Sequence, residues 1–136
     1  MQGLDLIGKA LIDKGDLIVA QHPTYVGALD AWRPRQPSYA PPDWTLAEPA
    51  FGERLARAKF VYAVPNYSNP TGALVPTAAR QALRERVMAS GTWLVEDDPY
   101  LPLQYDGDAG PSILALHGRM APNGPYGGPV IYLGTL

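Results

Sequence analysis

Short apolar segments alternate along the chain with segments whose apolar residues recur at helical spacing. The apolar segments are three to five residues long, which is typical of buried strands rather than of helices. We therefore expect four strands, at Leu17–Ala20, Phe60–Val64, Trp93–Val95 and Val130–Leu133.

Helices are expected between these strands and ahead of the first one. Leu4, Ile7 and Leu11 recur at helical spacing, and Gly15 follows as a stop signal. Residues 33–49 contain five prolines, which neither donate to a ladder nor continue a helix, so we expect a loop there with room for an edge strand at most. The expected helices cover residues 3–13, Val26–Trp32, Phe51–Ala58 and Pro76–Ser90.

The alternation of short strands with helices predicts an α/β fold. Buried parallel strands joined by crossover helices give three layers, α/β/α, around a mainly parallel sheet. Ligands of such sheets bind at the carboxyl ends of the strands, so we expect the functional residues at that one edge. The loops after the four strands are His22–Tyr25, Pro65–Gly72, Glu96–Tyr100 and Gly134–Leu136.

Composition narrows the function classes. The chain has 136 residues, 46% of them hydrophobic and 18% charged, as expected for one globular domain. A net charge of −2 without a run of Lys or Arg argues against nucleic acid as a partner. The absence of cysteine excludes disulfides and thiolate metal sites and suits a reducing cytosol. No apolar stretch approaches the ~20 residues of a membrane span, and the start lacks the pattern of a signal peptide, so we expect a cytoplasmic protein.

Four motifs lie at the ends of the expected strands. They are HPTYVGAL (22–29), PNYSNPTG (65–72), VEDDPY (95–100) and YLGTL (132–136). With these motifs in this order, the chain resembles the pyridoxal-phosphate-dependent aminotransferases of fold type I, class I and II. Within them it is most similar to 2-aminoadipate and kynurenine aminotransferases and to the aminotransferase-like domains of MocR-type regulators. The resemblance covers nearly the whole chain, and it implies pyridoxal 5'-phosphate as the cofactor.

The resemblance assigns roles to five residues. Asp97 matches the carboxylate that pairs with the protonated nitrogen of the pyridine ring. Asn69 and Tyr100 match the pair that hydrogen-bonds the phenolic oxygen of the cofactor. Tyr25 matches the aromatic ring that stacks on the pyridine face, and Thr135 matches the hydroxyl that binds the phosphate. Each residue taken alone has an ordinary structural alternative, such as a solvated acid, a turn residue or a packed core tyrosine.

The remaining polar residues receive no functional role. Asp98 is expected to point away from Asp97 and to be structural, and neither His22 nor His117 matches a functional position. The Asn69–Pro70 peptide bond is expected to be cis, because a cis proline is usually kept in a tight functional turn. None of the arginines matches the substrate-carboxylate position, and we expect all of them to be solvated surface charges. These arginines are Arg33, Arg35, Arg54, Arg57, Arg80, Arg84, Arg86 and Arg119.

The family pattern extends beyond both ends of the sequence. After Gly-Thr it continues with one residue, then Ser, then the Schiff-base lysine, which would stand two places beyond Leu136. At the start, Met1 stands where the family has a phosphate-binding Gly-Ser-Gln. We therefore expect residues 1–136 to be a partial large domain, truncated at both ends, without the catalytic lysine and inactive alone.

Three functions remain open. The resemblance implies an enzyme that, at full length, transfers an amino group between an amino acid and a 2-oxo acid as a cytoplasmic homodimer. The second function is the aminotransferase-like sensor domain of a MocR/GntR-type transcriptional regulator. The third possibility is a gene fragment without a function of its own. The sequence identifies no particular amino donor.

Overall fold

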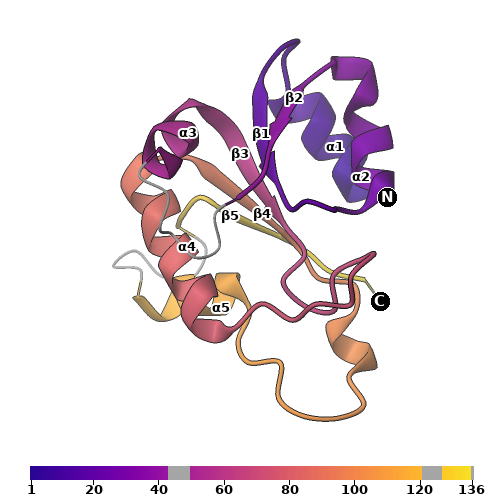
Figure 1. Cartoon of the computed structure of the whole chain (residues 1–136), viewed down its shortest axis with the longest axis vertical. Helices are drawn as coiled ribbons and strands as arrows, with labels where there is room; N and C mark the ends of the chain where they lie inside the picture. Colours follow the sequence, from indigo (N-terminus) through magenta and orange to yellow (C-terminus); the bar gives the residue numbers. More distant parts are fainter. Residues whose placement is uncertain (43–49, 121–126, 136) are drawn as a thin grey trace.

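The computed structural model describes residues 1–42, 50–120 and 127–135. Within these ranges five parallel strands form one sheet in the order β2-β1-β3-β4-β5, and helices cover both of its faces (Figure 1). The three-layer α/β/α fold expected from the sequence is confirmed. The strands are β1 (Leu17–Ala20), β2 (Ser38–Ala40), β3 (Ala58–Ala63), β4 (Trp93–Asp97) and β5 (Val130–Leu133). The helices are α1 (Gln2–Leu11), α2 (Val26–Trp32), α3 (Phe51–Arg57), α4 (Thr77–Ser90) and α5 (Ile113–Met120), with short 3-10 helices η1 (Arg33–Arg35) and η2 (Leu101–Leu103).

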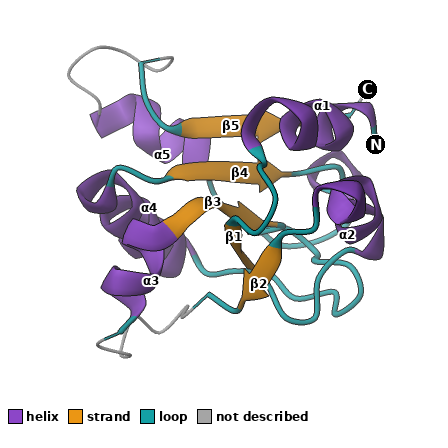
Figure 2. Ribbon diagram, turned by 90° about the horizontal axis from the view of Figure 1, so that it is seen from above, coloured by secondary structure: helices purple, strands orange, loops and turns teal. Residues whose placement is uncertain are grey.

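Alternate residues of β1, β3, β4 and β5 contribute to two separate cores. On one face, Tyr62 of β3 and Val95 of β4 pack with α1 and α2. On the other face, Val61 and Leu94 pack with α3, α4 and α5. Figure 2 shows the sheet between these two groups of helices. Burial on both faces explains why the strands are apolar throughout rather than alternating.

The four expected strands are all present, and β1 and β5 have the expected bounds. β3 begins at Ala58, directly after α3, and β4 continues to Asp97. The proline-rich segment contributes the edge strand β2, which pairs with β1. Its three residues lie between Pro37 and Pro41, so none of its ladder positions is a proline.

The helices differ more from expectation than the strands do. α2 has the expected bounds, whereas α1 ends at Leu11, because Ile12 is already extended with φ −98° and ψ 122°. α5 was not expected at all. Its first turn is capped by Ser112, whose Oγ accepts the Ala115 N–H at 3.0 Å.

A second cap on α5 comes from the sheet. The Glu96 side chain is fully buried on the face opposite to Asp97, and its carboxylate accepts the N–H groups of Ile113 at 2.8 Å and Leu114 at 2.9 Å. Burial raises the pKa of Glu96 to about 7, although the two N–H groups act in the opposite direction. A carboxyl from β4 therefore fixes the start of α5.

The raised pKa of Glu96 predicts a dependence of stability on pH. Because the folded pKa, about 7, lies above the ordinary value of 4.5, the folded state binds more protons than the unfolded state between these values. The stabilising contribution is complete below pH 4.5 and is lost as the pH rises through 7. Replacing Glu96 with glutamine is expected to remove this pH dependence. It changes the free energy of unfolding by about 3 kcal/mol between pH 4.5 and 7. Urea unfolding at a series of pH values measures it.

The matched control is Glu85→Gln, which changes an exposed glutamate of α4. The Glu85→Gln protein should keep the slope of the wild type. An unchanged slope in Glu96→Gln would contradict the assignment of the titration to Glu96.

Arg80 does not have the solvated position expected for every arginine. Its side chain is 0% exposed, and its guanidinium donates from Nε to the Val75 carbonyl at 2.7 Å and from Nη2 to Asn66 Oδ1 at 2.7 Å. It also donates to the carbonyls of Pro111 at 3.1 Å and Pro65 at 3.3 Å. The start of α4 lies against loops whose carbonyls need donors, and the planar guanidinium satisfies four acceptors at once.

Some of the other arginines are solvated as expected, and some are not. Arg84, one turn after Arg80 on α4, is also buried, so the expectation of a solvated charge is wrong there too. Arg54 is half-buried and donates to the Pro41 carbonyl at 3.0 Å. The side chain of Arg119 lies outside the described residues. The exposed arginines, as expected, are Arg33, Arg35, Arg57 and Arg86.

Candidate active site

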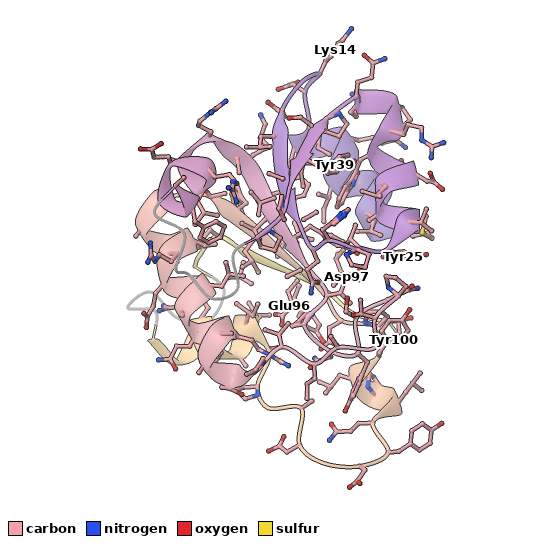
Figure 3. All side chains as sticks on the ribbon, viewed as in Figure 1. Lys14, Tyr25, Tyr39, Glu96, Asp97 and Tyr100 are labelled. Carbon is pink, nitrogen blue, oxygen red and sulfur yellow. The ribbon has the colours of Figure 1, made fainter. Side chains whose placement is uncertain are left out.

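A pocket of about 250 Å³ lies at the carboxyl ends of the strands. It is bounded by the first turn of α1, by the loop after β1, by the loop after β3 and by the ends of β4 and β5. Figure 3 shows Tyr25, Asp97 and Tyr100 at this end of the molecule, with Glu96 on the other face of the sheet. The side chains that the sequence marked as candidates all line this one pocket: Tyr25, Asn69, Asp97, Tyr100 and Thr135.

Asp97 is the acidic group of the pocket. It is half-buried at the end of β4, and its Oδ2 accepts a hydrogen bond from the Tyr62 hydroxyl at 2.6 Å. Burial raises the pKa of Asp97, while the hydrogen bond from Tyr62 lowers it. A partly desolvated carboxylate is stabilised by a cationic partner, so the pocket suits a ligand with a positively charged N–H at this point.

Asp98, the next residue, is placed differently. It is buried, it does not line the pocket, and its Oδ2 accepts a hydrogen bond from the Tyr132 hydroxyl at 3.1 Å. The expected separation of two neighbouring acids, one toward the pocket and one away from it, is confirmed. The alternation of side chains along β4 and just beyond it produces this separation.

Asn69 and Tyr100 lie next to each other in the pocket lining. Asn69 Nδ2 lies 3.5 Å from the Tyr100 hydroxyl, which is long for a hydrogen bond, since these are usually near 2.9 Å. Both groups can therefore donate to a common acceptor oxygen of a ligand. The Asn69–Pro70 peptide bond is cis, as expected, and so is His22–Pro23, which the sequence analysis did not single out.

Tyr25 is the residue before α2, and its hydroxyl lies 3.3 Å from Met1 Sδ. Its ring folds back over the first turn of α2, where a Cβ at Gly27 would collide with it. A glycine at this position therefore allows the aromatic ring to lie at the pocket wall. The contact is steric and was not apparent from the sequence.

Backbone donors and a hydroxyl also line the pocket. The first-turn N–H groups of a helix have no acceptor within the helix, and Met1, Gly3 and Leu4 of this turn line the pocket. α1 lies close to the end of β5, where a Cβ at Gly3 would come within 2.9 Å of Leu133 Cδ2. Thr135 follows as an exposed residue at the pocket rim. This combination suits an anionic group such as a phosphate.

These groups together fit pyridoxal 5'-phosphate. The pocket offers an anion for a cationic ring nitrogen, two donors for an oxygen, an aromatic ring and donors for a phosphate. Its volume is close to the lower end of the ~300–1,000 Å³ of small-ligand sites. In the described ranges no group of His, Cys, Asp and Glu side chains could hold a metal ion, and no helix is long and apolar enough to cross a bilayer.

The lysines lie away from the pocket. Lys9 pairs with Asp5 at 2.7 Å on the surface of α1, and Lys14 is exposed in the following loop. Lys59 pairs with Asp16 at 3.0 Å near the start of β3, at the other end of the strand from the pocket. None of these amines lines the pocket.

Tyr62 is the residue that sequence reasoning missed. It lies in a buried strand three residues before Pro65, the start of the PNYSNPTG motif, and the sequence analysis treated it only as part of an apolar segment. Its partner Asp97 is 35 residues away in the chain. The one available signal was a hydroxyl within a fully buried strand, because buried tyrosine hydroxyls usually have a partner.

Comparison with known proteins gives a consistent result. The chain is 36% identical to the 2-aminoadipate transaminase of Thermus thermophilus and 33% identical to aromatic-amino-acid aminotransferase 1 of Thermococcus litoralis, in both cases over 98% of its own length. It spans about a third of these curated relatives, 34% and 33%. The whole length of such a protein is therefore about three times that of this chain.

Solved structures agree with these relatives. The chain matches a Pyrococcus horikoshii kynurenine aminotransferase, solved in complex with pyridoxamine phosphate (PMP), with a TM-score of 0.82 and 35% identity. It matches an α-aminoadipate aminotransferase of T. thermophilus, complexed with N-(5'-phosphopyridoxyl)-L-leucine, with a TM-score of 0.81 and 38% identity. Each match covers 98% of this chain and 34% of the other. Since the family model for aminotransferase class I and II matches residues 2–136, the chain belongs to this family of pyridoxal-phosphate-dependent enzymes of fold type I.

Proposed function

We propose that these residues are part of the cofactor-binding large domain of an enzyme that transfers an amino group between an amino acid and a 2-oxo acid. The observation that carries this proposal is the convergence of five side chains, from a strand end and from loops far apart in the sequence, on one pocket. The family membership and the span of about a third of the relatives support it.

Each side chain has a role toward the cofactor in this proposal. The pyridine ring supplies an electron sink for the reacting amino acid when it is bound. Asp97 holds the proton at the ring nitrogen, because an ionised carboxylate favours the protonated form of that nitrogen. Asn69 and Tyr100 donate to the phenolic oxygen, and Tyr25 packs against the ring. Thr135 and the first-turn N–H groups of α1 bind the phosphate.

The amine that holds the cofactor covalently is proposed to lie outside these 136 residues. The three lysines of the chain do not line the pocket, which supports this. The resemblance, in which the lysine follows the Gly-Thr motif, also supports it. The complete protein is proposed to be a homodimer.

The test compares the complete protein that contains this chain with the 136-residue chain alone. The complete protein is expected to transfer amino groups from at least one donor among 2-aminoadipate, kynurenine and the aromatic amino acids. The chain alone is expected to show no turnover and, after borohydride reduction and peptide mapping, no site-specific pyridoxyl label. A stoichiometric label on Lys9, Lys14 or Lys59 with turnover would show that the chain is an enzyme by itself. A complete protein that binds the cofactor without turnover would favour the sensor function instead.

A further inference from the structure

Tyr62 connects the pocket carboxylate to the core behind it. The side chain is 0% exposed, and its hydroxyl donates to Asp97 Oδ2 at 2.6 Å. Burial raises the pKa of the Tyr62 hydroxyl, and the nearby carboxylate raises it further, so the hydroxyl keeps its proton and acts as the donor. Tyr62 does not line the pocket itself.

The ring of Tyr62 is fixed by Trp32. The two rings meet edge to face, with centroids 5.0 Å apart and planes at 90°. Trp32 is also fully buried, and its Nε1–H donates to the Leu4 carbonyl at 2.8 Å. Leu4 lies in the first turn of α1 and lines the pocket. One buried aromatic pair therefore holds both the carboxylate and the helix start that faces it.

The hydrogen bond leaves one oxygen of Asp97 for a ligand. Tyr62 occupies Oδ2, and among the described residues the structure records no further partner for this carboxylate. A carboxyl group held at one oxygen by a rigid donor has a fixed plane, and its second oxygen has a fixed direction. The other side chains that act on this pair are Asp98, Tyr25 and Tyr100.

We propose that Tyr62 is a positioning residue, which orients the Asp97 carboxylate toward the ring nitrogen of the cofactor and keeps it ionised. The inference rests on the proposed function. A merely structural tyrosine would affect every ligand of the pocket equally. A residue that acts through Asp97 affects only ligands that carry the ring nitrogen.

The experiment uses the complete protein in its apo form and two non-covalent ligands. One is pyridoxamine 5'-phosphate, and the other is its analogue with a C–H in place of the ring nitrogen. Tyr62→Phe, which removes only the hydroxyl, is expected to weaken binding of pyridoxamine 5'-phosphate by about 10-fold, since it removes one hydrogen bond to a charged group. Binding of the analogue is expected to stay unchanged. Calorimetric or fluorescence titration measures both affinities.

Tyr132→Phe is the matched control. It removes a tyrosine hydroxyl from β5, which pairs with β4. This hydroxyl donates to Asp98 and not to Asp97. It is expected to bind both ligands as the wild type does. A pH titration of the Asp97 carboxyl carbon by NMR gives a second readout without a ligand. Tyr62→Phe should raise the pKa of Asp97, because it removes a donor to the ionised form.

The outcomes separate this inference from the proposed function. An equal loss of affinity for both ligands in Tyr62→Phe would mean a structural role and overturn the inference. The inference would also be overturned if the Tyr62→Phe protein had the same ligand affinities and the same Asp97 pKa as the wild type. A wild-type protein that does not prefer the ligand with the ring nitrogen would contradict the proposed role of Asp97 itself.

Discussion

Replacing Arg80 with leucine is expected to lower the free energy of unfolding by about 3–5 kcal/mol. The guanidinium is fully buried and satisfies the carbonyls of Pro65, Val75 and Pro111 together with Asn66 Oδ1. Leucine would leave all four acceptors without this donor in a place that water does not reach, which is more costly than losing a solvated hydrogen bond. Urea unfolding followed by circular dichroism measures the change.

Two further variants make this prediction specific. Arg80→Lys keeps the charge but cannot reach four acceptors with a planar fork, so it should fall between the wild type and Arg80→Leu. Arg57→Leu removes an exposed arginine of α3 and should change the free energy of unfolding by less than about 0.5 kcal/mol. An Arg80→Leu protein as stable as Arg57→Leu would contradict the buried network.

Arg80 also bears on the site. Its acceptors Pro65 and Asn66 belong to the loop that carries Asn69, so the guanidinium holds this loop from the face of the sheet that α4 covers. Glu96 lies on that same face and caps α5. The two buried charged residues thus fix elements behind the pocket, while Asp97 faces it.

The features that could be predicted from the sequence depend on short-range patterns. Strands buried on both faces are continuous apolar segments, and β1 and β5 could be located to the residue. The site residues could be found because the carboxyl ends of parallel strands meet at one edge, which places Asn69 and Asp97 in one pocket. The resemblance supplied the roles, which remain proposals.

The features that could not be predicted depend on partners distant in the chain. The burial of Arg80 requires a carbonyl at Pro111, and the role of Tyr62 requires a carboxylate on the next strand. α5 is short, and part of its cap is the Glu96 carboxylate rather than a local residue. Such contacts exist only once the sheet has formed, so neither periodicity nor motif spacing indicates them.

Asp97→Asn in the complete protein is expected to reduce the turnover number by at least about 10²-fold, which is the usual effect of removing one preorganised electrostatic partner. Asparagine keeps the shape of the side chain but has no charge to hold the proton at the ring nitrogen. The Tyr62 hydroxyl can still donate to the amide oxygen, so the fold should be retained. Steady-state kinetics with the best amino donor, together with an unfolding curve, measure both quantities.

Asp98→Asn is the control for this prediction, because the two acids are adjacent in the chain but differ in their surroundings. Asp98 is buried, pairs with Tyr132 and does not line the pocket, so its loss should affect stability far more than turnover. The two variants are thus expected to show opposite patterns, with Asp97→Asn folded and slow and Asp98→Asn less stable and still active. Equal turnover in the two variants would mean that the position of Asp97 in the pocket has no part in the chemistry, and the proposed role of its carboxylate would be wrong.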